Sequence, residues 1–155
     1  MKGDENVKIA IGSDHAAVDL KDEVINILKS RNIEYKDMGT FKGERADYPD
    51  IAEKVCEQVT NKACDKGVLL CGTGVGMSMC ANKIKGIRAC VCTDVFSAKL
   101  TVMHNDCNVL CMGERVLGPG LMGEILVGWL DAEFEGGRHL DRVNKIRAIE
   151  EKNFK

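Results

Sequence analysis

The spacing of hydrophobic residues alternates between two patterns along this chain. Short segments dense in apolar residues alternate with longer segments in which an apolar residue returns every three or four positions. The short segments predict β-strands over residues 7–11, 33–38, 68–71, 88–92 and 107–112. The longer segments predict helices over residues 16–31, 49–61, 77–82, 95–103, 119–132 and 139–152.

Strands that alternate with helices are typical of a parallel sheet covered on both faces. We therefore expect an α/β protein, a three-layer α/β/α Rossmann-like sandwich with a five-stranded parallel sheet. Ligands bind such sheets at the carboxyl ends of the strands. The polar segments that follow the predicted strands are Asp14-His15, Cys71 to Gly76, Thr93-Asp94 and Gly113 to Arg115.

Composition narrows the class of protein further. At 155 residues, 45% hydrophobic and 30% charged, the chain suits one domain over residues 1–155 with a single core. We expect residues 1–6 to be a flexible polar N-terminus. A net charge of −2 and the lack of long basic runs argue against nucleic-acid and membrane partners. No apolar stretch approaches the roughly 18 residues of a transmembrane helix.

The eight cysteines do not indicate a disulfide framework. The polar N-terminus does not resemble a signal peptide, so we expect a cytoplasmic protein with reduced thiols. No C-x-x-C pair occurs, and the remaining close spacings are poor for zinc, so no metal site is expected. We expect every cysteine except Cys71 to act as a small buried hydrophobe.

Cys71 stands apart because it ends a predicted buried strand and begins a glycine-rich turn. Gly72, Gly74 and Gly76 remove Cβ atoms where backbone N–H groups can converge on an oxygen. The start of the following helix favours a thiolate. Thr73 adds a hydroxyl that can orient or relay a proton. The pattern indicates a thiol beside an oxyanion-type site.

Other interpretations of this turn differ in how well they fit. A phosphate-binding P-loop would need a Gly-Lys-Ser/Thr sequence, and a cysteine phosphatase would need arginine where Met77 stands, so both are excluded. A dinucleotide fingerprint lacks its last glycine, although Asp94 lies at a suitable distance for a ribose. A tight turn with a merely buried cysteine also remains open.

Two histidines strengthen the functional interpretation. His15 follows Asp14 at the end of the first predicted strand. His104 falls with Asn105 in a segment predicted as a loop, and we expect both histidines at the same sheet edge as Cys71.

Three arginines provide candidate anion ligands. Arg115 follows the last predicted strand, and Arg138 and Arg142 are four residues apart on one helix face, where they repel unless an anion compensates. Arginine suits bidentate phosphate recognition. A solvated basic patch is the alternative.

Taken together, these segments resemble the B-type ribose-5-phosphate isomerases, a family that includes the allose-6-phosphate and galactose-6-phosphate isomerases. The resemblance covers about residues 7–150, in the family's order. The matching segments are Gly12-Ser13-Asp14-His15, Asp47-Tyr48-Pro49, Cys71 to Gly76, Ala81-Asn82-Lys83, His104-Asn105-Asp106, Gly113 to Val116 and Glu135 to His139.

The resemblance implies interconversion of ribose 5-phosphate and ribulose 5-phosphate through an enediolate, without metal or organic cofactor. Cys71 would be the base, and His104 would open the furanose ring. Some members carry a glutamate as base four residues after the cysteine position, where this chain has Val75, which implies the cysteine-using branch.

The resemblance also assigns binding roles. It implies that Gly72, Thr73, Gly74, Val75 and Gly76 surround the developing oxyanion. The other implied substrate ligands are Asn105 for the oxyanion, Asp14 and His15 for the sugar and phosphate end, and Arg115, Arg138 and Arg142 for phosphate.

A homodimer or homotetramer with sites at the subunit interface is implied as well. The alternatives are an isomerase of allose 6-phosphate or galactose 6-phosphate, and a non-catalytic module that binds a sugar phosphate.

Overall fold

The computed structural model describes residues 7–154, so the predicted flexible segment 1–6 lies outside the described residues. Five strands form one parallel sheet in the order β2-β1-β3-β5-β4, which confirms the predicted fold class. The strands are β1 (Lys8–Ser13), β2 (Glu34–Asp37), β3 (Lys66–Cys71), β4 (Ala89–Val91) and β5 (Val109–Gly113). The helices of the described residues are α1 (Val18–Ser30), α2 (Tyr48–Thr60), α3 (Val75–Ala81), α4 (Val95–Asn105), α5 (Pro119–Asp131) and α6 (Arg138–Asn153).

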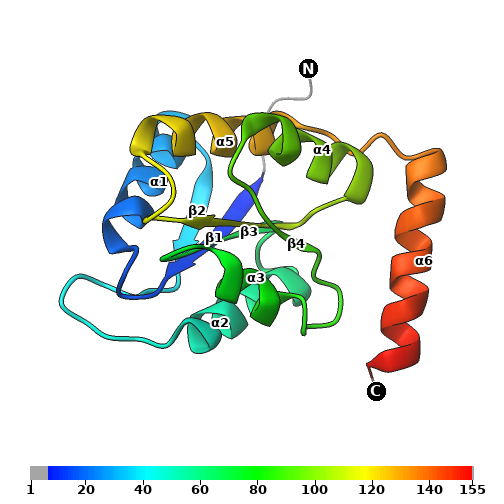
Figure 1. The fold of residues 1–155 in the computed structure, drawn as a ribbon, viewed down its shortest axis with the longest axis horizontal. Helices are drawn as coiled ribbons and strands as arrows, with labels where there is room; N and C mark the ends of the chain where they lie inside the picture. The colour runs from blue at the N-terminus through cyan, green and yellow to red at the C-terminus, as the bar shows by residue number, and fades with distance from the viewer. Residues whose placement is uncertain (1–6, 155) are drawn as a thin grey trace.

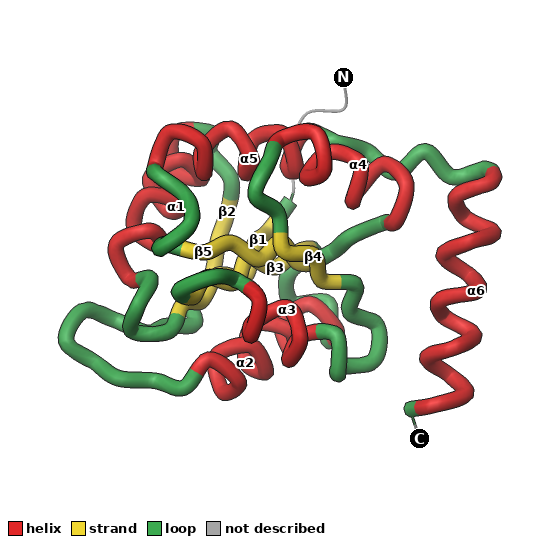
Figure 2. The backbone as a smooth tube through the Cα atoms, in the orientation of Figure 1, coloured by secondary structure: helices red, strands yellow, loops and turns green. Residues whose placement is uncertain are grey.

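Helices cover both faces of this sheet and make three layers (Figure 1). Helices α1, α4 and α5 lie on one face, and α2 and α3 lie on the other, with the strands between them (Figure 2). Each face has its own apolar cluster, one around Trp129 and Leu110 and the other around Val55 and Leu69. The central strands are buried on both sides, which explains their nearly continuous apolar sequences.

Helix α6 belongs to neither layer. It stands beside the β4 edge of the sheet, where it contacts α4 (Figure 1). Only His139 and Val143 of this helix are buried. Its other apolar side chains remain largely exposed, including Ile146 at 44% and Ile149 at 63%.

A buried ammonium group fixes the loop that leads from β2 to α2. Lys21, 1% exposed, donates to Asp37 Oδ1 at 2.9 Å and to the Thr40 carbonyl at 2.6 Å. Asp37 in turn accepts the Gly39 N–H at 2.9 Å. The start of this loop is therefore held beside the carboxyl end of β1, where Ser13 N–H donates to the Gly39 carbonyl at 2.8 Å.

The cysteines follow the predicted pattern with two exceptions. Five of those other than Cys71 are buried, and Cys80 and Cys90 are half-buried. Burial raises the pKa of Cys56 to about 12 and that of Cys92 to about 12, so these two thiols stay protonated at neutral pH. Across residues 7–154, no helix combines the length and apolar character needed to cross a membrane.

Candidate active site

The turn after β3 presents Cys71 at the carboxyl edge of the sheet. Cys71 is 5% exposed, and the Gly74 N–H donates to its Sγ at 3.1 Å. Gly74 adopts φ +81°, a left-handed conformation that favours glycine, and α3 begins at the next residue. Thr73 Oγ1 accepts the Val75 N–H at 3.3 Å. A backbone donor at the sulfur is placed to stabilise negative charge there.

The segment after β5 supports this turn from the neighbouring strand. Glu114 N–H donates to the Cys71 carbonyl and Arg115 N–H donates to the Gly72 carbonyl, both at 3.0 Å. The Arg115 guanidinium lies over Gly72, where an added Cβ would be 3.4 Å from its nearest nitrogen. Arg115 is thus beside the glycine turn, as expected for a residue at this edge.

Gly113 permits the close approach of these two segments. A Cβ at Gly113 would lie 2.5 Å from the Thr73 Cα and carbonyl carbon, which are backbone atoms with little freedom to move. We predict that Gly113→Ala displaces the turn, lowers stability by about 1–3 kcal/mol and costs on the order of 10²-fold in kcat/KM. Gly120→Ala is the matched control, because nothing lies within 4 Å of a Cβ there. Chemical denaturation and steady-state kinetics measure both effects, and an unchanged Gly113→Ala enzyme would contradict this packing.

Asp14 and His15 lie next to the same turn. The backbone N–H of Asp14 donates to the Leu70 carbonyl at 3.1 Å, and its carboxylate accepts the Ala16 N–H at 2.9 Å. His15 is exposed, with Nδ1 3.1 Å from the Ala46 carbonyl oxygen. The structure therefore brings Asp14, His15, the glycine turn and Arg115 together at one edge.

Tyr48 is a neighbour of this site to which the sequence interpretation assigned no role, although it lies in the matching segment Asp47-Tyr48-Pro49. A Cβ at Gly76 would lie 2.9 Å from the Tyr48 ring, so the ring packs against the first turn of α3. Tyr48 is 42% exposed. The signal available in the sequence was the glycine at 76, which indicates that something approaches the backbone closely.

His104 and Asn105 do not join this cluster, and the prediction for them was wrong in two respects. They form the last turn of α4 rather than a loop, because the helix continues until Asp106 ends it at φ +52°. Helix α4 runs back from the carboxyl edge after β4 to the start of β5. Within one chain, His104 therefore lies toward the amino edge of the sheet, opposite Cys71.

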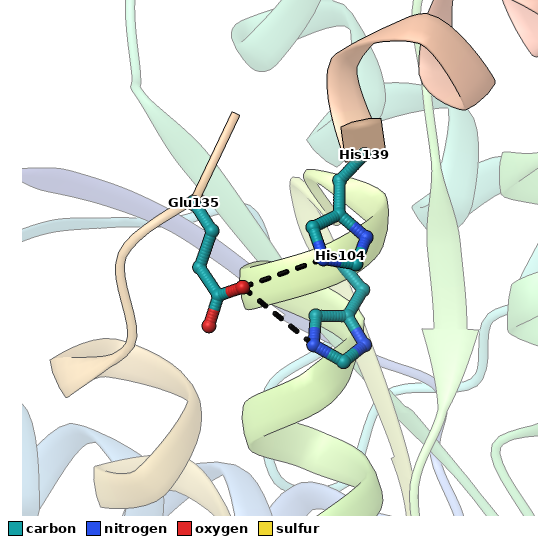
Figure 3. Close-up of side chains that lie close together, drawn as sticks. All are labelled: His104, Glu135 and His139. Carbon is teal, nitrogen blue, oxygen red and sulfur yellow. Dashed lines mark ion pairs between the residues drawn. The ribbon is translucent and has the colours of Figure 1, made fainter. Parts of the chain in front are cut away.

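A second cluster surrounds His104 at that end (Figure 3). His139, at the start of α6, stacks on His104 with ring centroids 4.1 Å apart and planes 5° apart. Glu135 Oε2 lies 3.3 Å from His139 Nε2 and 3.8 Å from His104 Nε2. Arg138 and Arg142 begin the same helix and are exposed. Sequence reasoning missed that Glu135 and His139 lie beside His104, since this proximity depends on how the segment from the end of α5 to the start of α6 packs against α4.

The electrostatics of this second cluster favour a neutral His139. Burial lowers the pKa of His139, and His104, Arg138 and Arg142 lower it further, whereas Glu135 opposes them. His139 is accordingly uncharged at neutral pH.

The fold and the carboxyl-edge cluster define a class: a Rossmann-like α/β protein with a thiol beside a glycine turn. Comparison with known proteins makes this more specific. A model of the ribose/galactose isomerase family matches residues 9–146. The chain belongs to this family and is therefore an isomerase, and the dinucleotide interpretation of the glycine turn finds no support.

Individual relatives agree with this family assignment. The chain is 49% identical over 145 residues to ribose-5-phosphate isomerase B of Escherichia coli, covering 94% of this chain and 97% of that protein. The structure of Clostridium thermocellum ribose-5-phosphate isomerase B matches with a TM-score of 0.92 and 51% identity, covering 94% and 99%. D-erythrulose-4-phosphate isomerase of Pectobacterium atrosepticum is 43% identical over 141 residues, covering 90% and 93%.

Proposed function

We propose that this protein interconverts ribose 5-phosphate and ribulose 5-phosphate, with Cys71 as the base and no cofactor. The observation that carries the proposal is the contact between the Gly74 N–H and Cys71 Sγ at the carboxyl edge of the sheet. Family membership and the E. coli and C. thermocellum relatives support the choice of substrate. We propose one isomerase domain over the whole chain, acting in the cytoplasm, where its free thiols stay reduced.

The proposed chemistry follows from the groups at the turn. The Cys71 thiolate removes the proton from C2 of the open aldose, and the electron pair forms the C1–C2 double bond of an enediolate. Negative charge moves onto O1, where backbone N–H groups of residues 72–76 and Asn105 stabilise it. The thiol then returns the proton to C1 as the C2 carbonyl forms, and the C2 hydroxyl proton passes to O1, which becomes a neutral hydroxyl. Thr73 can relay that hydroxyl proton.

The positions of the two clusters support a site made by two copies of the chain. Cys71 and His104 lie at opposite edges of one sheet, so a single chain cannot present both to one sugar. In a symmetric dimer the two clusters of different copies can face each other twice. We propose that the Cys71 cluster of one copy meets His104, Asn105, Arg138 and Arg142 of the other, with Arg115 completing the phosphate site.

Exposed apolar side chains support such an assembly. Phe96 is 73% exposed near the start of α4, and Ile146 and Ile149 remain open on α6. Large exposed apolar side chains are typical of contacts between subunits. A dimer, or a tetramer built from dimers, would bury them.

Substrate choice is the part of the proposal that needs direct testing. Allose 6-phosphate, galactose 6-phosphate and the tetrose phosphate named for the P. atrosepticum relative require the same proton transfer. We expect the highest kcat/KM on ribose 5-phosphate, measured for all four sugars by NMR. A higher kcat/KM on another of these sugars would identify that sugar as the substrate. Binding of the sugar phosphates without conversion of any of them would favour a non-catalytic module.

A further inference from the structure

His104 does not stand alone: the side chains of Glu135 and His139 lie against it and form a three-residue cluster. The imidazole rings stack in parallel, and both Nε2 atoms face the same carboxylate oxygen of Glu135 (Figure 3). The Glu135 N–H donates to the Met103 carbonyl at 3.0 Å, which ties the backbone of Glu135 to the residue before His104. This bond places the Glu135 side chain beside the end of α4.

A metal ion does not suit this arrangement, although the three ligand atoms lie within 4.8 Å of one another. The lone pair of an imidazole nitrogen lies in the plane of its ring, and the two ring planes are only 5° from parallel. One ion therefore cannot lie in both planes. Arg138 and Arg142 add positive charge near His139. The cluster is better suited to imidazole N–H groups that face a carboxylate than to coordination of a metal ion.

The Glu135 carboxylate determines which nitrogen of each imidazole ring carries the proton. An ionised carboxylate only accepts, so an Nε2 atom that faces it carries a proton in the favoured tautomer. His139 Nε2 lies 3.3 Å and His104 Nε2 lies 3.8 Å from Glu135 Oε2, both within ion-pair range. Each neutral ring then keeps its lone pair on Nδ1. The buried His139 ring also limits how His104 can turn, because the two rings are stacked.

We propose that Glu135 and His139 are positioning residues for His104, selecting its Nε2–H tautomer and its ring plane so that Nδ1 exchanges the proton with the sugar. This inference rests on the proposed role of His104 in ring opening. Nδ1 takes the proton of the anomeric hydroxyl, the bond between C1 and the ring oxygen breaks as the C1 carbonyl forms, and Nδ1 returns the proton to the former ring oxygen. The imidazolium formed in between lies beside the Glu135 carboxylate, which stabilises it.

Glu135→Gln tests the inference, because it removes the charge and keeps the size of the side chain. Glu133→Gln is the matched control, an exposed glutamate two residues earlier. Imidazole ¹⁵N chemical shifts of the full-length protein report which ring nitrogen carries the proton. We expect the Nε2–H tautomer of His104 in the unmodified protein and in Glu133→Gln, and a mixture of tautomers in Glu135→Gln.

Kinetics provide the second measurement. We expect Glu135→Gln to lose about 10- to 100-fold in kcat on ribose 5-phosphate. The loss should be much smaller on erythrose 4-phosphate, which cannot close a furanose ring because its O4 carries the phosphate. An unchanged His104 tautomer would overturn the inference, and so would equal losses on both sugars. A change of tautomer in a protein that isomerises no sugar would instead overturn the proposed function alone.

Discussion

Cys71→Ala should lower isomerisation of ribose 5-phosphate by about 10²- to 10⁴-fold, the range that a positioned general base contributes. The variant removes the sulfur that accepts the Gly74 N–H and leaves the arginines that would bind phosphate untouched. Affinity for a non-reacting sugar phosphate should therefore stay close to that of the unmodified protein. NMR-monitored turnover and isothermal titration calorimetry measure the two quantities.

Cys80→Ala provides the matched control for this prediction. Cys80 is a half-buried thiol in the next helix, and the substitution makes the same chemical change outside the turn. We expect Cys80→Ala to retain nearly full activity. If Cys71→Ala kept more than about a tenth of the activity, a loss smaller than general-base catalysis supplies, another group would have to move the proton.

His104→Asn should have the second largest effect, and the effect should depend on the sugar. Ribose 5-phosphate exists mainly as a furanose, so the variant would have to wait for the ring to open in water. At high enzyme concentration its rate should stop rising with added enzyme, because spontaneous opening becomes limiting. The unmodified protein should show no such limit over the same range.

An open-chain sugar separates ring opening from isomerisation. We expect the ratio of kcat/KM on ribose 5-phosphate to that on erythrose 4-phosphate to fall by about 10²-fold or more in His104→Asn, as for loss of an acid–base group. A proportional loss on both sugars would show that His104 acts in the isomerisation step itself.

The sequence predicted the layers of this fold well because its strands and helices have distinct apolar spacing. The predicted helix over 119–132 is close to α5, for which Pro119 provides a defined start. The strand order β2-β1-β3-β5-β4 does not follow from local pattern, since it depends on which strands pair. All strands of a parallel sheet have their carboxyl ends at the same edge. Asp14 and Arg115, which follow β1 and β5, were therefore expected near Cys71.

His104 illustrates what local pattern does not contain. The polar run from His104 to Asp106 has loop-like composition, yet its first two residues complete α4, and Asp106 caps the helix with its N–H on the Val102 carbonyl. Helix α4 is two residues longer at its C-terminus than predicted, so His104 lies in its last helical turn, just before β5. Glu135 and His139 become neighbours of His104 only when the segment around the start of α6 packs against α4, and such proximity leaves no periodic signal in the sequence.

A hybrid dimer tests the central claim, that one site takes Cys71 from one copy and His104 from the other. Cys71→Ala and His104→Asn chains carrying different affinity tags are co-expressed, and the species with both tags is isolated. One of its two sites then contains both substitutions and the other contains neither. A site shared between two copies predicts about half of the unmodified activity, far above either single variant, because symmetry gives each dimer two equal sites. A hybrid no more active than the single variants would contradict a shared site.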